Sequence, residues 1–585
     1  MGNDDRKPPA VDIARVQAPL VFGVTGHRDL REQDIPGLEA KVREVLLEFR
    51  RRYPSTPFIL LSPLAEGADR LVARVALNAD IGARLVAPLP MPQALYEADF
   101  TAPGSLNDFH TLLAKASYSF EIPCLVDEDA VRHPGQDRDK QYEKVGKYIA
   151  RESQTLIALW DGKPSTKVGG TAAIVKFQTE GIGEREDCDL TPPELFPVYR
   201  IVTPRVSNPD VVDGRPLDLQ ITYPPAFSDP KDAAKYYHRT FCNLEEFNRE
   251  VAEGGDTLWN EAVRSREWVT GSSPLADLSL GEELTLQRYA VADALARQHK
   301  DTMLRMHRAL HWLVFFSFLG LVLFAHLEAH PGVALALSLL LLGVGYLMHR
   351  RAKRMRLDVK SQDYRAMAEA CRVRFFWQVS GIRDSVSDNY LGKQRTELDW
   401  IRYGLRGWRI ETDTGELSLS SNSSDHLKFV LERWIKNQRE FFKNGSETSK
   451  EQSELMETWV SSCLSLAIGL AIALLGLVAY VQYSLDELWQ CPECTWIDWP
   501  VILIDAFLAA GALLHHANQR RAHAELRKQY TRMINIFENA SRAIGQKTDL
   551  QAARVCLQKL GQEALLENGD WVLLHRERPL ELPHP

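Results

Sequence analysis

The amino-acid sequence predicts two regions of different fold class: an α/β Rossmann-like domain at the N-terminus and an all-α membrane region in the C-terminal half. Residues 19–205 alternate short apolar runs with amphipathic stretches, as parallel α/β sheets do. The second half contains four long segments with almost no charge, which is typical of transmembrane helices. The length of 585 residues also exceeds that of most single domains.

Composition excludes several classes of protein. The net charge of −8 and the absence of a basic stripe argue against a nucleic-acid partner. Eight scattered cysteines are too sparse for a disulfide framework. Residues 1–18 are charged and lack the apolar core of a signal peptide, so we expect a short disordered tail there.

The N-terminal domain, 19–205, is read from its alternating elements. Apolar runs predict strands, and longer amphipathic stretches between them predict the connecting helices. We expect, in order, a strand at 19–26, a helix at 35–53, a strand, loop and helix within 57–77, strands at 84–90 and 117–123, a helix at 143–153, a strand at 155–162, a Gly-rich turn and helix at 168–181, and a closing strand at 197–204.

Three Gly-rich loops follow the expected strands at the carboxyl edge of the sheet, where ligands of such folds bind. Glycine lets a phosphate approach the backbone, and a helix N-terminus offers free N–H groups. No loop is a GxGxxG motif or a P-loop, so neither a dinucleotide oxidoreductase nor an NTPase is supported. No catalytic motif and no metal site is evident. The candidate ligand-binding residues are Gly23, Thr25, Gly26, His27 and Arg28, then Ser62, Glu66, Gly67, Asp69 and Arg70, then Asp161, Gly169, Gly170 and Thr171.

The segment 206–281 is rich in Pro, Asp and Ser, with short helical stretches, and we interpret it as a linker. A long helix is expected to begin near Glu282 and to run directly into the first span. Such a helix is a stiff element that can couple a sensor to a membrane region.

The membrane region is predicted to contain two hairpins. Residues 282–457 hold the first, with spans at 309–327 and 331–348, and residues 458–585 hold the second, with spans at 458–485 and 499–516. Amphipathic patterns predict cytosolic helices after each hairpin, within 357–409, at 427–443 and toward the C-terminus.

Basic residues follow the second and fourth spans, whereas the two short hairpin loops carry none. The positive-inside rule therefore places both termini in the cytoplasm. Trp489, Trp496 and Trp499 suit an interfacial belt on the opposite side. Cys491 and Cys494 form either a local disulfide or two free thiols there.

One acid stands inside the fourth span. Asp505, Ala509, Ala512 and His516 share one face at helical spacing, and a membrane carboxylate usually faces a bundle interior or water. We interpret this face as either a pore lining or a packing seam. The third span offers Gly469, Ala473 and Gly476 at matching spacing.

The motifs GVTGHRDL, LAEGADRL, LWDG and GGTAAIV resemble the SLOG superfamily, Rossmann-like domains related to the LOG and DprA proteins. The segments DYRAMAEACRVRFFW and DWVLLHRERP resemble the SLATT-type helical-hairpin effectors that accompany SLOG domains. The SLOG resemblance covers about a third of the chain. It implies a sensor of a nucleotide-derived signal, such as a cyclic nucleotide or an ADP-ribose derivative, made by a separate enzyme in bacterial antiphage defence.

One position departs from the family pattern. Enzymatic LOG proteins carry PGGxGTxxE, whose glutamate serves catalysis; here Gly170 and Thr171 match, but Ile174 stands at the glutamate position. An apolar side chain cannot act as an acid or base, so we expect ligand binding without hydrolysis. Glu66 and Asp69 remain as alternative carboxylates.

The sequence thus favours a nucleotide-signal sensor coupled to a pore-forming or membrane-disrupting effector, acting as a homo-oligomer. The first alternative is a membrane-tethered nucleotide or NAD hydrolase. The second is a regulated ion channel or transporter, although transporters usually have more spans and broken helices at the midplane.

Overall fold

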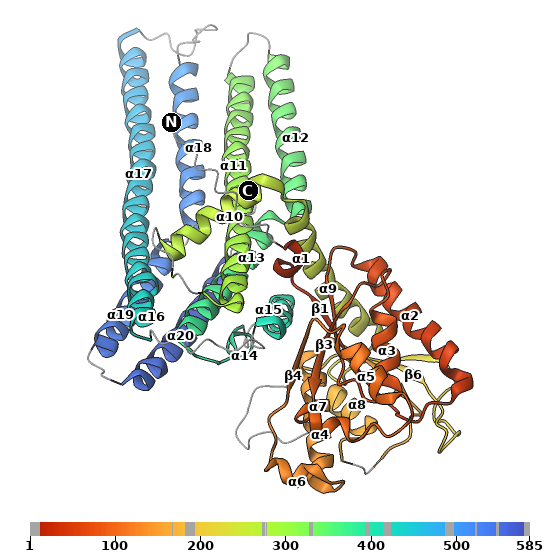
Figure 1. Cartoon of the computed structure of the whole chain (residues 1–585). Helices are drawn as coiled ribbons and strands as arrows, with labels where there is room; N and C mark the ends of the chain where they lie inside the picture. Colours follow the sequence, from red (N-terminus) through yellow and green to blue (C-terminus); the bar gives the residue numbers. More distant parts are fainter. Residues whose placement is uncertain are drawn as a thin grey trace, which may run out of the picture.

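The computed structural model describes residues 12–165, 168–181, 194–271, 275, 278–326, 331–391, 398–412, 423–485, 497–520, 523–545 and 549–577. It confirms the predicted fold class. An α/β domain lies beside a helical region in which four long helices stand side by side (Figure 1). The predictions for Cys491, Cys494, Trp489 and Trp496 concern residues outside the described ranges.

The sheet of the α/β domain has seven strands in the order β4-β3-β2-β1-β5-β6-β7. All neighbours are parallel except β6 and β7. The inner strands form because their apolar residues are covered on both faces; β2, for example, is buried at every position. The strands are β1 Leu20–Gly26, β2 Phe58–Leu61, β3 Arg84–Leu89, β4 Tyr118–Glu121, β5 Thr155–Trp160, β6 Val198–Val202 and β7 Leu219–Thr222.

Helices pack on the sheet through apolar stripes of helical spacing. In α2, proline in the first turn suits the helix start, and Leu38, Val42 and Phe49 are among the buried residues of one face. The helices of this domain are α2 Ile35–Arg52, α3 Ala68–Ala76, α4 Gln93–Glu97, α5 Ser105–Leu113, α6 Glu128–Arg132, α7 Gln136–Glu152 and α8 Thr171–Glu180, with a short 3₁₀ turn, η1, at Glu32–Asp34.

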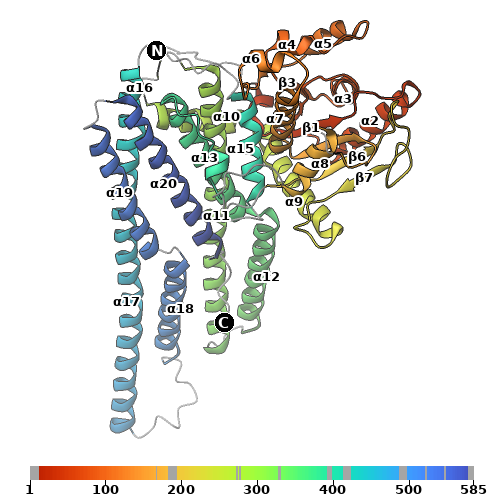
Figure 2. The same cartoon turned by 90° about the horizontal axis from the view of Figure 1, so that it is seen from below.

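Two boundary predictions were wrong. Residues 12–18 are not part of a tail: they form α1 (Ile13–Val16), and the Gln17 amide donates to the Asn248 carbonyl over 2.9 Å. The expected linker 206–281 contains the antiparallel strand β7 and two helices, α9 (Pro230–Glu253) and α10 (Gly255–Thr270). Helix α9 packs because its apolar stripe is buried, so this segment belongs to the core (Figure 2).

The membrane helices agree with the predicted spans. Helix α11 (Leu280–His326) runs unbroken from the α/β domain into the first span, as expected, and α12 (Pro331–Met355) returns. Ser317 and Ser338 exchange hydrogen bonds between these two helices. The second hairpin is α17 (Asn437–Leu485) and α18 (Asp498–Arg520). The helix expected at 427–443 is not separate, because α16 (Ser423–Val430) continues through a π-helical turn, η2 (Leu431–Lys436), into α17.

The remaining helices form a helical base, which we define as α13 (Leu357–Val379), α14 (Val386–Asn389), α15 (Asp399–Thr412), α19 (His523–Gly545) and α20 (Leu550–Glu577). One buried apolar cluster runs from β1 through α9 and α11 into this base. The α/β domain and the helical base therefore share a core.

Candidate ligand site and its junction with the membrane helices

Strand β1 lies between β2 and β5 in the sheet. The strands β2, β3 and β4 are added in turn on one side of β1, and β5 and β6 are added on its other side, so the strand order reverses beside β1. This is the switch point at which ligands of open α/β sheets bind. Gly26 pairs with Leu159 of β5, and a Cβ atom on Gly26 would lie 2.4 Å from the Ala68 Cβ. Glycine is thus required for α3 to approach the end of β1.

A second glycine brings the same loops together. Gly67 has φ +78°, and a Cβ atom there would lie 2.4 Å from the Arg28 carbonyl oxygen. The Ala68 N–H donates to the His27 carbonyl over 3.0 Å. The loops after β1 and β2 are therefore joined backbone to backbone.

The third loop leads into α8. Gly169 has φ +71° and lies against α7, since its Cβ would be 2.8 Å from the Glu143 nitrogen. Gly170 is the N-cap residue of α8 and has no side chain to bond the first N–H groups, and Thr171 is the first residue of the helix. The first turn of α8 contains no acidic residue. The positive end of the α8 dipole is left without a neutralising carboxylate of its own first turn, which favours an anion.

Arg28 is the predicted cation that remains exposed at this edge. Its guanidinium carbon lies 5.0 Å from the centroid of the Tyr142 ring of α7. The Tyr142 hydroxyl donates to Asp99, which also pairs with Arg138 over 2.8 Å. Among the described residues Arg28 has no ion-pair partner, so its charge is available to a ligand.

A buried polar cluster lies near Arg28. Asp69 is 7% exposed, and burial raises its pKa to about 7 although Arg28 and Arg70 oppose the shift. Arg70 donates to the carbonyls of Leu64 and Ser105 and is buried. Within the described ranges, one Arg70 nitrogen, Nη2, and the buried Tyr96 hydroxyl have no hydrogen-bond partner. This cluster holds a carboxyl group that titrates close to neutral pH.

His27 and Asp161 come together, but they fasten loops. The Asp161 N–H donates to His27 Nε2 over 3.1 Å, and Arg205 Nε lies 3.0 Å from the Asp161 carboxylate. Burial lowers the pKa of His27 although Asp161 opposes the shift, so the imidazole is neutral at pH 7. Asp161 is 1% exposed. Both residues hold the ends of β1, β5 and β6 together.

Other predicted residues are also structural. A Cβ on Gly23 would lie 2.4 Å from the Ser153 Oγ, inside the sheet. Ser62 is buried and accepts from the Leu64 N–H. Glu66 accepts a hydrogen bond from the Ser105 hydroxyl. Thr25 is half-buried at the end of β1.

Ile174, at the position where a LOG-type glutamate was expected, is 2% exposed. It fills the contact between α8 and α7: a Cβ on Gly146 would lie 2.6 Å from its Cδ1. The position therefore serves packing.

Sequence reasoning missed Tyr96, Asp99, Arg138 and Tyr142. The first two follow β3, whose carboxyl end shares this edge, and the other two lie on α7. Their segments contain no glycine motif, so only the rule that strand ends meet at one edge would have drawn attention to the loop after β3.

In the spans, Asp505 and His516 face the first hairpin. Asp505 lies 4.0 Å from His326 of α11, and the rings of His516 and His311 are 6.4 Å apart. Ala509 is half-buried and Ala512 is exposed. A Cβ on Gly469 or Gly476 would meet nothing within 4 Å, so these glycines do not pack against α18. Ala473 is likewise exposed.

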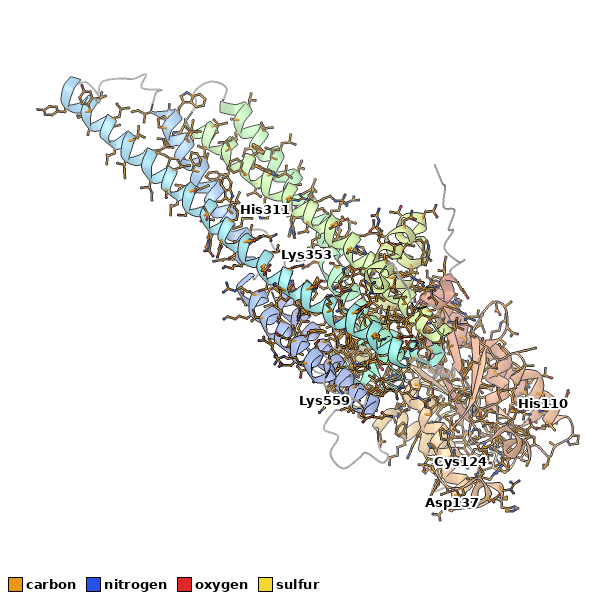
Figure 3. The ribbon with its side chains drawn as sticks, turned by 60° about the vertical axis from the view of Figure 1, so that its left-hand side comes forward. His110, Cys124, Asp137, His311, Lys353 and Lys559 are labelled. Carbon is orange, nitrogen blue, oxygen red and sulfur yellow. The ribbon has the colours of Figure 1, made fainter. Side chains whose placement is uncertain are left out.

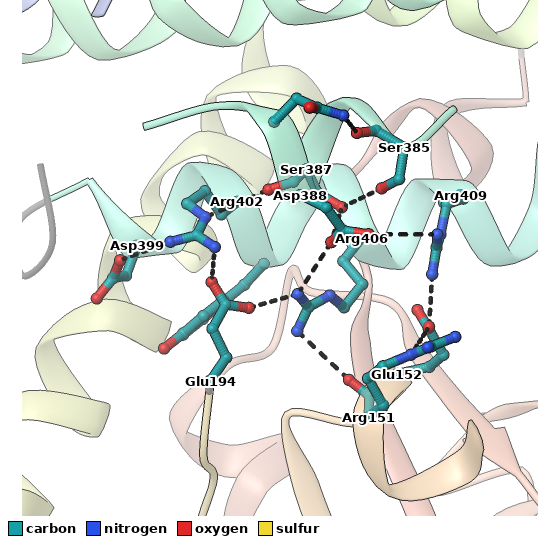
Figure 4. A network of polar contacts seen from close by, with 12 residues as sticks. Arg151, Glu152, Glu194, Ser385, Ser387, Asp388, Asp399, Arg402, Arg406 and Arg409 are labelled. Carbon is teal, nitrogen blue, oxygen red and sulfur yellow. Dashed lines mark hydrogen bonds and ion pairs between the residues drawn. The ribbon is translucent and has the colours of Figure 1, made fainter. Parts of the chain in front are cut away.

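Helix α15 joins the α/β domain to the helical base through arginines at positions 402, 406 and 409 (Figure 4). Arg409 binds Glu152 at the end of α7, and Arg402 and Arg406 bind Glu194. Glu152 is 0% exposed. Burial raises its pKa, but Arg409, Arg406 and Arg151 outweigh this effect and hold the pKa below its ordinary value. The junction is a buried, charged network.

Helix α11 reaches the same junction. Arg288 of α11 donates to the Arg15 carbonyl over 2.7 Å and to the Trp408 carbonyl over 3.2 Å. Glu411 of α15 pairs with both Arg288 and Arg84, the first residue of β3. The helix that enters the membrane is thus bonded directly to the α/β domain.

The comparisons with known proteins identify no family for this chain. No protein-family model matches the chain, and no curated protein matches its sequence. Within the described ranges, no group of three or more His, Cys, Asp or Glu side chains is arranged to hold a metal ion.

Proposed function

We propose that this chain is a sensor–effector membrane protein: a phosphate-bearing, nucleotide-derived ligand binds at the carboxyl edge of the sheet and changes the arrangement of the membrane helices. In the SLOG and SLATT interpretation the protein resides in a bacterial inner membrane with both termini in the cytoplasm. The signal is a cyclic nucleotide or an ADP-ribose derivative made by a separate enzyme during phage infection.

The observation that carries the proposal is a continuous path from the sheet edge to the first span. Tyr142 of α7 lies under Arg28 at the edge, and Glu152 at the end of the same helix binds Arg409 of α15. Ten residues of helix separate them, about 15 Å. Helix α15 then contacts α11 through Glu411 and Arg288. A shift of α7 on ligand binding is passed on because packed helices move as rigid bodies.

The chemistry of the edge fits a phosphorylated ligand. A guanidinium and a helix N-terminus are the groups that bind phosphate best. Arg28 and the start of α8 both contact the first half of α7, at Tyr142 and Glu143 respectively. A ligand that bridges them would pull on α7 from two sides, which gives it different affinities for two states of the protein.

The spans fit an effector that works by assembly. Only 6% of the most apolar window of α17 is buried, and 11% of that of α18. These surfaces are available to lipid or to other copies of the chain, and four spans are few for a pore in one chain. We propose a homo-oligomer whose contacts change when the ligand binds.

The test uses the full chain in lipid vesicles loaded with a dye, because β7 and α15 both lie beyond residue 205 and complete the α/β domain. Cyclic ADP-ribose species, cyclic di- and trinucleotides, ADP-ribose and AMP are added in turn. The thermal shift, the dye release and the chromatographic recovery of each compound are measured. Variants are Arg28→Gln, Arg409→Gln and the control Arg51→Gln, an exposed arginine on α2.

We expect one compound to stabilise the wild type, to release dye and to be recovered intact. Arg28→Gln should lose the thermal shift, Arg409→Gln should keep it and lose dye release, and Arg51→Gln should behave as wild type. Stabilisation by none of the compounds would contradict nucleotide sensing. Unchanged dye release in Arg409→Gln would contradict coupling through the junction.

A hydrolase is the second candidate, and Asp69 is the observation that favours it. A buried carboxyl with a pKa of about 7 can donate or accept a proton at neutral pH. Steady consumption of a nucleotide or NAD by the wild type, lost in Asp69→Asn, would establish this activity. Intact recovery of a bound ligand would exclude it for that compound.

A further inference from the structure

The end of α12 that adjoins the helical base carries four cations in five residues. Arg350, Arg351, Lys353 and Arg354 directly follow the apolar span and are exposed. In the part of the chain that the structure describes, none of them has an ion-pair partner. Lys353 lies at the same end of the spans as His311 (Figure 3). An apolar helix in a membrane would hold these cations at the level of the lipid headgroups.

The cations that follow α12 directly, in contrast, pair with acidic residues of α9. Arg356 lies 3.6 Å from Glu246 of α9, and Lys360 pairs with Glu246 and Glu250 over 2.8 and 2.7 Å. The acidic residues of α9 therefore pair with Arg356 and Lys360. Among the described residues no acid pairs with the cations of α12, so a partner outside the chain can bind them.

Three of these cations share one hollow. Arg350, Arg351 and Arg354, together with Leu347 and Met355, line a space of about 560 Å³. Their spacing of i, i+3, i+4, i+7 and i+8 places them on one face of α12. Leu347 is 66% exposed and lies one turn nearer the membrane. A charged face with an apolar residue on its membrane side is complementary to the phosphate and the upper acyl chain of a phospholipid.

We propose that this face of α12 is a binding site for an anionic phospholipid of the leaflet nearest the α/β domain. The guanidinium groups bind the lipid phosphate, and Leu347 contacts the first methylenes of its chains. The site fixes the depth of α12 and hence the distance of the α/β domain from the membrane. This inference does not depend on which ligand binds at the sheet edge.

Native mass spectrometry of the full chain, titrated with phosphatidylglycerol or phosphatidylcholine, tests the proposal. The variant R350Q/R351Q/R354Q removes the cations of the hollow. The matched control R305Q/R308Q/K353Q removes three charges at the same end of the spans without touching the hollow. The charge-preserving variant R350K/R351K/R354K reports on folding, and excess inorganic phosphate serves as competitor.

We expect the wild type, the control and the lysine variant to retain phosphatidylglycerol in preference to phosphatidylcholine. The glutamine variant should lose at least roughly tenfold of this preference, because each direct hydrogen bond from a guanidinium group to the charged phosphate contributes about tenfold or more. Equal losses in the glutamine variant and the control would show a general charge effect and overturn the site. Displacement of the lipid by inorganic phosphate would also overturn it, because the site would then bind any phosphate.

Discussion

The α/β domain and the membrane hairpins are both rich in apolar residues, but they differ in what covers those residues. Strands β1 and β2 are buried almost throughout by other parts of the same chain. The most apolar windows of α11, α12, α17 and α18 are only 22, 11, 6 and 11% buried. The α/β domain and the helical base thus bury their apolar residues against each other. The apolar residues of the spans require lipid or further copies of the chain to cover them.

This difference determines whether a substitution changes the free energy of unfolding or the assembly of the protein. A change in the α/β domain or at the junction meets close-packed neighbours, so it alters the free energy of unfolding. A change on an open face of a span meets nothing within the chain, so its effect appears only in assembly or in the membrane. The following substitutions test this contrast, in order of decreasing expected effect on stability.

The largest effect is expected from Glu152→Ala at the junction. The substitution removes the carboxylate that Arg409 binds, whereas Arg406 keeps Glu194. Because Arg409 is partly exposed, the loss should lower the free energy of unfolding by about 3 kcal/mol. Thermal unfolding followed by circular dichroism measures the loss. The control is Glu48→Ala on α2, whose carboxylate pairs with exposed arginines and should matter by less than about 1 kcal/mol. Equal effects of the two changes would show that the junction is not a buried network.

The next effect compares two glycines, one from each region. Gly26→Ala should cost about 1–3 kcal/mol, because its Cβ would press on the Ala68 Cβ and on the Leu159 carbonyl. Gly469→Ala on α17 meets no atom and should be neutral or stabilising by up to about 1 kcal/mol. Size-exclusion chromatography of Gly469→Ala completes the comparison. A loss of oligomer without a loss of stability would show that a second copy covers α17.

A pH dependence is expected from Asp69. Its folded pKa of about 7 lies above the value of about 4 in an unfolded chain, so the folded state binds more protons between these pH values. The contribution of Asp69 to stability is therefore complete below about pH 4 and is lost as the pH rises toward 7, on the order of 1 kcal/mol per unit. The midpoint of thermal unfolding of the wild type should fall relative to Asp69→Asn over this range. A constant difference between the two proteins would contradict the raised pKa.

The smallest effect on stability is expected from Arg28→Gln. Because this side chain is exposed and has no ion pair among the described residues, the free energy of unfolding should change by about 0.5 kcal/mol or less. A much larger loss in thermal unfolding would mean that Arg28 holds the edge together, as Arg70 does, and would remove it from the ligand site.

Much of the fold could be predicted because the decisive signals are local. Continuous apolar runs marked β1, β3 and β5, and the uncharged segments marked all four spans. The linker was misjudged although α9 carries a local signal: Asp229 caps the helix, Pro230 begins it, and its apolar residues recur at helical spacing. The loops rich in Pro and Asp before it outweighed that pattern.

The Gly-rich loops of the candidate site lie at one edge of the sheet, but the sequence does not sort their residues by role. Gly26, Gly67 and Gly169 permit close backbone approach, which sequence motifs reveal. Whether a polar residue faces a ligand or an internal partner depends on distant positions: Asp161 is held by Arg205, and Arg70 by Ser105. Such partners are set by the tertiary fold, so Arg28 could not be separated from His27 in advance.

The hydrogen bonds that join residues 15 and 17 to residues 288 and 408 have a consequence for biosynthesis. Trp408 donates to the Gln17 carbonyl, and Arg288 to the Arg15 carbonyl. The N-terminal domain therefore emerges from the ribosome long before its last neighbours exist; at roughly 5–20 residues per second the delay is on the order of tens of seconds. During that interval the first hairpin is already being inserted into the bilayer. We expect the nascent α/β domain to stay incomplete, and hence unable to bind its proposed ligand, until the first hairpin is in the bilayer.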